Sequence, residues 1–409
     1  MQKYLQLSCA TLLFLVALVV FEFSVYIAND MVQPSMPAVT KEFGVSTAWV
    51  PTSMTAFLLG GALLSWLVGP LSDHVGRRPV MLCGVMLFIS SCLATYFSHS
   101  IISFLLLRVL QGMGLCFISS VGYATVQDAF EEKVAVKATA LMANISLIAP
   151  LIGPVAGAVF AHFWPWRDTF ALIAALASLS FVGLYAFMPE TVQQPTGRIK
   201  LLHVGRQYLS VFGNRRFFVT ALCGPLLSLP LIGWIALSPV MLIESVGMSL
   251  LEYGLWQIPI FASLIAGNLL LVKLVDRGPL GHSVKLGMVP LLLGVLIIVL
   301  GSFSSCPSCF LIAGMCLMAL GEGLSFAVMY RFALTAIPVS KGMVAACIAT
   351  LTLLVYVLGL EFLNQAYLYA GFVGFAALSL LFAFSFSCLS PRVVREAMAE
   401  RASGENQAK

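Results

Sequence analysis

Residues 69–79 read "GPLSDHVGRRP", a short polar stretch between two long apolar runs. Arg77 and Arg78 follow Asp73 by four and five residues, so these side chains can meet where one helix ends and the next begins. Charge-assisted hydrogen bonds among them would hold the two helix ends together, and Gly69 would let a neighbouring helix approach closely. Taken alone, the stretch is equally compatible with a basic loop that only sets the orientation of the chain.

The composition of the chain places most of it in a lipid bilayer. Of 409 residues, 60% are hydrophobic and 10% are charged, whereas a soluble domain carries about 25% charged residues. A membrane-spanning helix needs about 20 apolar residues, and the sequence contains roughly twelve runs of that kind. These runs are far longer than the alternating segments of about 10 residues in a membrane β-barrel. We therefore predict an all-α integral membrane protein with twelve transmembrane helices.

The net charge of +5 reports membrane orientation. If the amino terminus is cytoplasmic, all but three of the 22 Lys and Arg residues fall on the cytoplasmic side, the exceptions being Lys41, Arg108 and Arg167. This bias is the positive-inside pattern of membrane proteins. We therefore expect both termini in the cytoplasm and no nucleic-acid partner.

Two six-helix bundles are predicted from the spacing of the apolar runs. A polar stretch rich in Arg and Lys divides them, and the loop at 272–286 is a degraded echo of the loop at 69–82. Parallel six-helix repeats are typical of secondary transporters that rock between two states. The predicted parts are an N-terminal bundle at 1–188, a cytoplasmic linker at 189–215, a C-terminal bundle at 216–390 and a cytoplasmic tail at 391–409.

Two further stretches carry unusual residues inside apolar runs. "LLLRVLQG" (105–112) places Arg108 about a third of the way into its span. A buried Arg costs about 2.5–3.5 kcal/mol or more unless it is paired or hydrated; snorkelling to the membrane surface is the alternative. "ANISLIAPLIGPVAGAVF" (143–160) contains Pro150, Gly153, Pro154 and Gly157. These residues are expected to bend the helix and to let a neighbouring helix approach closely.

The first apolar run carries a polar face in "EFSVYIANDM" (22–31). Glu22, Tyr26 and Asp30 are spaced four residues apart and span about 80° of one helix face, and Asn29 extends it. Such a face should line a water-filled interior. Burial disfavours the charged form of a carboxylate, so each acid could take up or release a proton, and a bound cation would compete with that proton. The alternative is that one acid merely pairs with Arg108.

These motifs resemble signatures of the major facilitator superfamily. The loop at 69–79 is similar to the helix 2–3 signature G-x-L-x-D-R-x-G-R-R/K, with His74 where that pattern usually has Arg. The stretch at 143–160 resembles the antiporter signature G-x-x-x-G-P-x-x-G-G of drug/proton exporters, with Ala149 and Ala158 replacing the outer glycines. The resemblance implies the twelve-helix fold of that superfamily and favours antiport over symport.

A closer resemblance covers nearly the whole chain. "EFSVYIANDMVQP" (22–34) is similar to the first helix of the MdfA-type multidrug/proton antiporters, as are "WVPTSMTAFL", "TALMAN" and "LPLIGWIALSP" elsewhere. This resemblance implies that Glu22 and Asp30 bind protons and substrate. It further implies that the drug pocket is lined by Tyr26, Asn29, Met54, Ser146, Leu231 and Ile235.

The expected function is proton-driven efflux of amphipathic cations and of neutral drugs such as chloramphenicol-like compounds. We expect a monomer in the bacterial inner membrane that exchanges protons for drugs by alternating access, with no cofactor and no enzymatic activity. The alternative on the same fold is a proton-coupled exporter of a single metabolite or sugar. Arg108, Asp73, Arg77 and Arg78, with the Gly and Pro residues of 143–160, are expected to couple and gate this exchange.

Two more acids lie in apolar runs near the end of the chain. In "LGEGLSF" (320–326) the glycines beside Glu322 predict a local helix break, with Arg331 or a group on a neighbouring helix as its partner. An auxiliary ion pair is the favoured role for Glu322 and for Glu361, and a third titrating site is the alternative.

The remaining reactive residues give weak signals. "CPSC" (306–309) falls in a predicted external loop, where a disulfide is possible. The five His residues are well separated along the chain, which argues against a metal site within the membrane. We find no phosphate-cradling or hydrolase motif, so we do not expect ATP to supply the energy.

Overall fold

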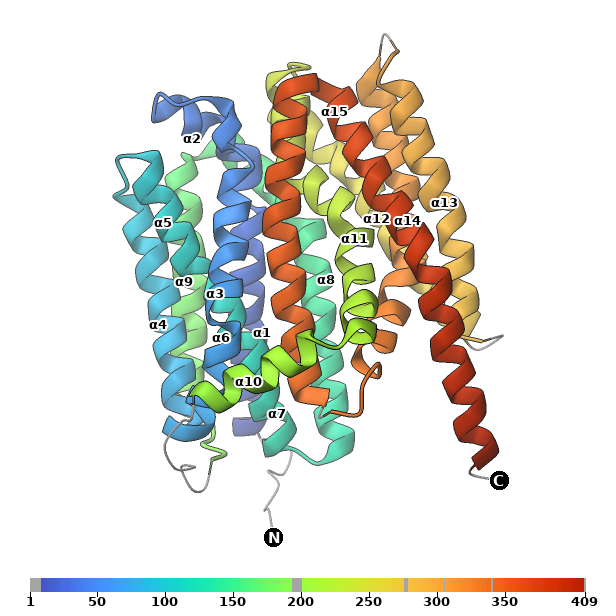
Figure 1. Ribbon diagram of the computed structural model, residues 1–409. Coiled ribbons are helices and arrows are strands. Elements are labelled where there is room, and N and C mark those ends of the chain that lie inside the picture. Colours follow the sequence, from blue (N-terminus) through green and yellow to red (C-terminus); the bar gives the residue numbers. More distant parts are fainter. Residues whose placement is uncertain (1–8, 193–200, 276–278, 305, 340, 408–409) are drawn as a thin grey trace. The chain divides into compact units, whose positions relative to one another are not determined.

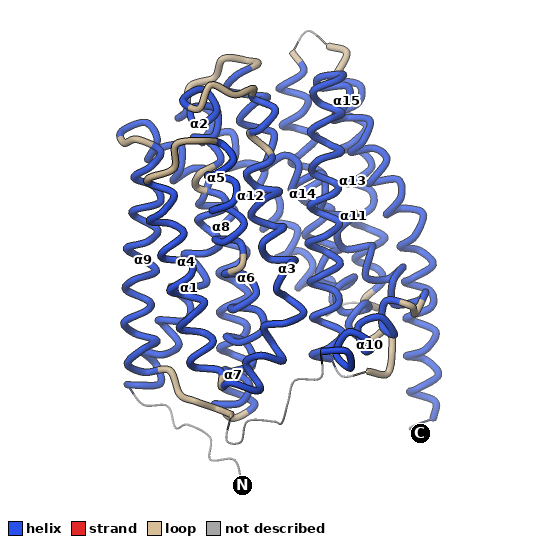
Figure 2. Tube along the Cα trace, turned by 60° about the vertical axis from the view of Figure 1, so that its left-hand side comes forward, coloured by secondary structure: helices blue, strands red, loops and turns tan. Residues whose placement is uncertain are grey.

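Residues 9–192, 201–275, 279–304, 306–339 and 341–407 are described by the computed structural model of the chain. These residues form helices joined by short loops, and no strand occurs among them (Figure 2). The chain divides into two units, each of which packs mainly against itself. The first unit holds Met1–Leu201 with Ser249–Gly254, and the second holds Leu202–Met248 with Leu255–Lys409.

The first unit is built around helix α1, which packs against α8 and α9 (Figure 1). The apolar stretch Ile101–Ala129 consists of α5, α6, a π-helical segment and α7 in succession. The helices of this unit are α1 (Cys9–Asp30), α2 (Met36–Glu42), α3 (Thr52–Val75), α4 (Arg77–Tyr96), α5 (Ile101–Gly112), α6 (Gly114–Phe117), η3 (Ile118–Gly122), α7 (Tyr123–Ala129), α8 (Glu132–Phe163) and α9 (Trp166–Phe187), with short 3-10 turns at Gln33–Ser35 and Thr47–Trp49.

Two glycines bring the backbones of α3 and α5 into contact. A Cβ atom on Gly60 would lie 1.9 Å from the carbonyl oxygen of Val109, and one on Gly112 would lie 1.7 Å from that of Phe57. At Gly69, which the sequence suggested as a point of close approach, an added Cβ atom would lie 3.9 Å from its nearest neighbour, the Ser120 Cβ, which is an ordinary van der Waals contact. The prediction for Gly69 is therefore wrong, and the close contact lies earlier in α3, at Phe57 and Gly60, next to Arg108 of α5.

The second unit contains the remaining helices. Helix α10 falls within the range predicted as a linker, and Val211 at its end joins a core cluster with Phe217 of α11 and Val344 of α15. Residues 276–278, which include Asp276 and Arg277 of the degraded loop repeat, lie outside the described residues. The helices are α10 (Leu201–Phe212), α11 (Arg215–Ser238), η4 (Pro239–Glu244), α12 (Leu250–Val275), α13 (Gly281–Gly301), α14 (Pro307–Leu334) and α15 (Lys341–Gln407). Leu201 and the first turn of α12, Leu250–Gly254, are counted with the first unit.

The predicted membrane architecture is confirmed. Ten helices of the described residues are long and apolar enough to cross a membrane. One of them, Met343–Ala399, contains Gly371 with φ of 59°, which divides it into two helices. Helix α8 adds the apolar stretch Ile148–Phe163. Together these account for the twelve predicted crossings, and the last helix continues through Pro391 to Gln407.

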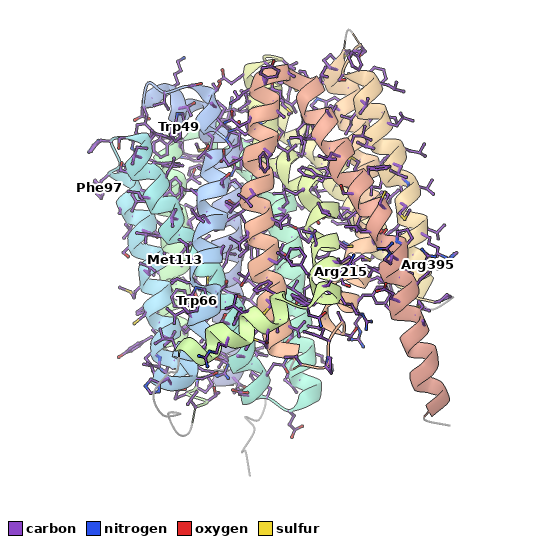
Figure 3. The ribbon with its side chains drawn as sticks, in the orientation of Figure 1. Trp49, Trp66, Phe97, Met113, Arg215 and Arg395 are labelled. Carbon is purple, nitrogen blue, oxygen red and sulfur yellow. The ribbon has the colours of Figure 1, made fainter. Side chains whose placement is uncertain are left out.

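Large apolar side chains project from the outside of the helices, as expected for surfaces in contact with lipid (Figure 3). Trp66 on α3 and Phe97 after α4 are both exposed in the first unit. In the second unit, the exposed Arg215 and Arg395 lie toward the end of the unit where the chain's carboxyl terminus is found. Exposed apolar side chains on long helices are what contact with lipid requires, and both arginines lie outside the protein interior.

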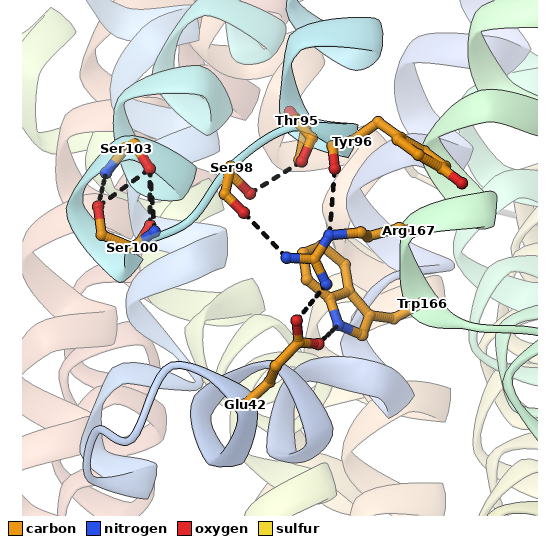
Figure 4. Close-up of polar contacts among 8 residues, drawn as sticks. All are labelled: Glu42, Thr95, Tyr96, Ser98, Ser100, Ser103, Trp166 and Arg167. Carbon is orange, nitrogen blue, oxygen red and sulfur yellow. Dashed lines mark hydrogen bonds and ion pairs between the residues drawn. The ribbon is translucent and has the colours of Figure 1, made fainter.

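A polar cluster ties α2 to the start of α9 (Figure 4). The Trp166 indole donates a 2.6 Å hydrogen bond to Glu42, and Arg167 forms an ion pair with the same carboxylate. Arg167 also donates to two carbonyl oxygens, those of Tyr96 (3.1 Å), the last residue of α4, and Ser98 (2.9 Å), which follows α4. Arg167, one of the three exceptions to the charge bias, is therefore used to join loops at one end of the unit.

Cys306 and Cys309 lie at the beginning of α14. Both are exposed free thiols with their sulfur atoms 2.9 Å apart, so the possible disulfide is not formed in this structure. The hydrogen bond with Cys309 stabilises the Cys306 thiolate and lowers the pKa of Cys306 below its ordinary value of 9.0.

The pH dependence of Cys306 alkylation checks this contact. A lowered pKa means that more thiolate is present at any pH below 9.0, and the thiolate is the nucleophile. In reduced protein, iodoacetamide should therefore modify Cys306 at a lower pH than an ordinary thiol. Cys309→Ala should move the pH–rate profile to higher pH. Peptide-resolved mass spectrometry measures both profiles, and identical profiles would contradict the proposed contact.

The α3–α5 contact predicts a large effect of one added methyl group. Gly112→Ala places a Cβ atom inside the Phe57 carbonyl, and overpacking of this kind costs about 1–3 kcal/mol or more. We expect a lowered Tm of the purified protein in detergent, measured by intrinsic fluorescence. Gly69→Ala is the matched control, because its Cβ would be in ordinary contact. Equal Tm values for the two variants would contradict the assigned packing.

Candidate functional site

The polar face of α1 is turned into the first unit. Glu22, Asn29 and Asp30 are 0%, 6% and 3% exposed, and Tyr26 between them is half-buried. Tyr26 lies within electrostatic range of both carboxylates. The helical spacing predicted from the sequence therefore places these four residues in one buried region.

Glu22 has one satisfied and one unsatisfied oxygen. Its Oε1 accepts a 3.1 Å hydrogen bond from the hydroxyl of Tyr123, at the first position of α7. Its Oε2 is buried without a hydrogen-bond partner among the described residues. A buried carboxylate oxygen without a partner is costly when it is charged, so it marks a position for a proton or for a cationic group.

Asn29 bridges Asp30 and Arg108 by hydrogen bonds, and the two charged groups also interact electrostatically. The Asn29 amide donates a 2.9 Å hydrogen bond to Asp30 Oδ1, and the Asn29 Oδ1 accepts a 3.2 Å bond from Arg108. No ion pair within 4.0 Å joins Arg108 to Asp30 or Glu22 in the described part of the chain. The alternative that one acid merely pairs with Arg108 is therefore not what the structure shows.

Arg108 is fully buried and hydrogen-bonded. Besides Asn29, its guanidinium donates to the Ala28 carbonyl (3.1 Å), the Ser53 hydroxyl (3.2 Å) and Gln111 Oε1 (2.8 Å). It also lies 4.8 Å from the centre of the Phe57 ring. Snorkelling is excluded in this structure, because every polar contact of the side chain points inward.

The Ala28 contact explains why a cation belongs at this position. Ala28 lies in the last turn of α1, where helix carbonyls lack partners within the helix. A positive charge near the carboxyl end also interacts favourably with the helix dipole. Gln33 satisfies the neighbouring Asn29 carbonyl with a 3.0 Å hydrogen bond. Arg108 and Gln33 thus complete the end of α1 beside Asp30.

Helix α8 fits against the same end of α1 through its glycines. A Cβ atom on Gly153 would lie 2.5 Å from the Asp30 Cβ, and one on Gly157 would lie 2.1 Å from the Met31 carbonyl oxygen. The predicted close approach at these glycines is confirmed, with α1 as the neighbour. The helix continues through both Pro150 and Pro154.

For the remaining predicted pocket residues, the structure gives positions on helices, and these positions alone do not link them to Glu22 or Asp30. Met54 is buried on α3 of the first unit. Leu231 and Ile235 are buried on α11 of the second unit. The side chain of Ser146 lies outside the described residues. A drug pocket formed by these four residues stays a prediction.

The loop at 69–79 forms an ion-pair network. Arg77 lies 3.3 Å from Asp73, as predicted, and 2.8 Å from Asp128 of α7. Arg78 instead donates a 2.6 Å hydrogen bond to the Tyr185 carbonyl. The network therefore fastens the ends of α3 and α4 to α7 and α9.

Glu190, which follows α9 in the sequence, caps the amino terminus of α4. Its carboxylate accepts hydrogen bonds from the backbone amides of Arg77 (3.0 Å) and Arg78 (3.1 Å), at the amino terminus of α4. Gly76 adopts a φ of 113°, and a Cβ there would lie 2.6 Å from Glu190. Only glycine meets both the conformational and the spatial requirement.

Sequence reasoning missed several partners that complete the site. Tyr123, Gln111 and Ser53 contact the α1 carboxylates or Arg108, and Asp128 and Glu190 hold the loop. A polar residue inside an apolar run was the available signal for Gln111 and Tyr123. Nothing in the sequence indicates which group each would meet.

Twelve membrane crossings and a buried region of carboxylates beside a hydrogen-bonded arginine define the class of multi-pass membrane transporters. Residues 18–360 match the family model of the Major Facilitator Superfamily, and the chain belongs to that superfamily.

Among similar proteins, the Multidrug transporter MdfA of Edwardsiella ictaluri (strain 93-146) is 45% identical over 400 residues, covering 98% of each chain. Those of Yersinia pestis bv. Antiqua (strain Angola) and Escherichia coli O6:H1 are each 47% identical, covering 92% and 90% of both chains. The resemblance to MdfA-type proteins is therefore confirmed.

Solved structures agree on the fold. The D-xylose-proton symporter has a TM-score of 0.74 at 13% identity, with 92% of this chain and 97% of that chain covered. A bacterial homologue of the lysosomal transporter Spinster has a TM-score of 0.71 at 14% identity, with 96% and 98% covered.

The contacts of Arg108 predict that lysine cannot replace it. Lysine lacks the planar fork that reaches several acceptors at once, and each hydrogen bond to a charged group contributes about 1.5–3 kcal/mol. Arg108→Lys should therefore lower the Tm of the purified protein by several degrees. Arg395→Lys, at an exposed position on α15, is the control and should leave the Tm unchanged. An equally small effect in both variants would show that the network around Arg108 is not stabilising.

Proposed function

We propose that the chain is a proton-driven multidrug exporter of the bacterial inner membrane, which exchanges protons for amphipathic cations and neutral drugs. Its relatives are named multidrug transporters and are 45–47% identical over at least 90% of the chain. The proposal includes a monomer with both termini in the cytoplasm, in line with the positive-inside charge bias. Protons are the coupling ion, and no cofactor takes part.

The observation that carries the proposal is the state of the two acids on α1. Glu22 and Asp30 are buried, and neither is ion-paired with Arg108. A buried carboxylate without a counter-ion favours its neutral form. Each acid can therefore hold a proton at rest and can exchange that proton for a cationic substrate.

The exchange follows from competition for the same oxygens. A cationic drug that approaches Glu22 or Asp30 stabilises the ionised form, so binding of the drug expels a proton. When the site opens to the acidic side of the membrane, protonation removes the negative charge and weakens the binding of the cation. Alternating access of the site to the two sides then converts a proton gradient into drug export.

Neutral drugs need a different source of affinity in the same region. Met54 and the half-buried Tyr26 present apolar surface with a hydroxyl group nearby, and binding sites of this kind are mostly apolar with a few polar groups. Transport of a neutral drug would then be coupled to protons through hydrogen bonds between the drug and Glu22 or Asp30, which differ between the neutral and the ionised acid.

The test uses purified protein in liposomes that contain a fluorescent pH dye. With an acidic interior, adding several unrelated cations or chloramphenicol-like compounds should dissipate the gradient. Glu22→Gln and Asp30→Asn should reduce this response by at least tenfold for cations. Glu252→Gln removes an exposed acid at the start of α12 and is the matched control.

The outcomes separate the alternatives. A response to only one compound would favour an exporter of a single metabolite or sugar. Normal transport by both Glu22→Gln and Asp30→Asn would overturn the assigned proton and substrate site.

A further inference from the structure

We propose that Glu322, in the second unit, is a third proton-binding carboxylate that takes up and releases a proton during transport. This inference rests on the proposed proton-coupled function and extends it to a group outside the α1 site. Glu322 lies within α14 and is 9% exposed. The Ser228 hydroxyl, from α11, donates a 2.5 Å hydrogen bond to its Oε1.

The orientation of Glu322 is fixed by the glycines on either side of it. A Cβ atom on Gly321 would lie 2.5 Å from the Gly287 carbonyl oxygen of α13, and one on Gly323 would lie 2.4 Å from the Leu264 carbonyl oxygen of α12. Helix α14 is unbroken from Pro307 to Leu334, so the predicted local break is wrong. The glycines are sites of close helix packing, which leave the carboxyl group directed toward α11.

Of the two predicted partners of Glu322, Arg331 is wrong, and a group on a neighbouring helix is correct. Nine residues of helix separate the two side chains, a rise of roughly 13 Å, and Arg331 is exposed. No Lys, Arg or His nitrogen lies within 4.0 Å of the Glu322 carboxylate in the part of the chain that the structure describes. The partner is instead the hydroxyl group on a neighbouring helix.

Among the described residues, the titratable groups near Glu322 supply no neutralising charge within ion-pair distance. Tyr356 of α15 is 9% exposed and faces both Ser228 and Glu322. Glu361, five residues further along α15, has a buried oxygen without a hydrogen-bond partner among the described residues. The described charges of α11, α12 and α13 lie within five residues of the helix ends and are Arg215, Arg216, Glu252, Lys273, His282 and Lys285.

This environment suits a proton better than a structural ion pair. A membrane-buried carboxylate without a cation favours its neutral form. The Ser228 hydroxyl can donate to the carboxylate once the proton has left, because a hydroxyl rotates to suit its acceptor. Ser228 therefore makes both protonation states accessible, whereas a salt bridge would fix the charged state.

The experiment counts protons released when a drug binds. Purified protein in weakly buffered detergent solution is mixed with excess tetraphenylphosphonium, and a pH dye reports the protons released per protein. Glu322→Gln should release about one proton fewer than the wild type over the pH range in which Glu322 titrates. Glu322→Asp keeps an acid and should restore release. Glu252→Gln, which removes an exposed acid, should match the wild type.

The outcomes distinguish this inference from the proposed function. If the wild type releases protons and Glu322→Gln releases the same number at every pH, the role of Glu322 is wrong and antiport through α1 stands. If the wild type releases none, the proposed antiport itself fails, and the role of Glu322 fails with it. If Glu322→Gln does not fold, the Ser228→Ala variant tests the inference in its place. Ser228→Ala removes a hydrogen-bond donor to the charged carboxylate, so it should shift the pH range over which protons are released. An unshifted pH range would overturn the inference.

Discussion

The structure of the first unit depends on one buried guanidinium group. Arg108 joins α5 to the last turn of α1 and to α3 through hydrogen bonds that no other residue type could make together. A buried arginine costs about 2.5–3.5 kcal/mol or more, and four bonds of about 1.5–3 kcal/mol each offset that cost. The close α3–α5 contact at Gly60 and Gly112 keeps Arg108 within reach of these acceptors.

Helix α7 connects the buried acids to the loop at 69–79. Tyr123 at its first position contacts Glu22, and Asp128 near its last position contacts Arg77. Five residues of helix separate the two, a rise of roughly 7.5 Å. Any movement of this short helix would therefore alter a carboxylate contact and an ion pair at the same time. The preceding π-helical segment, Ile118–Gly122, is a type of element often found at functional positions.

Sequence reasoning succeeded where a residue type is rare in its surroundings. Glu22, Asp30 and Arg108 are unusual in apolar runs, so helical periodicity and membrane energetics were enough to place them inside the protein. The spans followed from run length alone. Reasoning failed where one pattern fits two structures: glycines can break a helix or let two helices touch, and Gly321 and Gly323 do the second.

Tertiary partners could not be predicted in the same way. Tyr123, Ser228 and Glu190 are ordinary residues whose importance comes from what another helix brings to them. The bridging role of Asn29 also depends on how α5 sits against α1. A single sequence contains the chemistry of such groups but not their distances.

The acceptors of Arg108 are all electrically neutral: an amide on Asn29, an amide on Gln111, a hydroxyl on Ser53 and a backbone carbonyl on Ala28. None of these acceptors is an acid that takes up or releases a proton, so the guanidinium can keep the same hydrogen-bond partners when a nearby carboxylate changes charge. The charge of Asp30 still acts on Arg108 through space, but the contacts that hold the end of α1 do not include the titrating groups themselves. Glu22 and Asp30 can therefore change their protonation while the hydrogen bonds of Arg108 continue to hold the helices that position them.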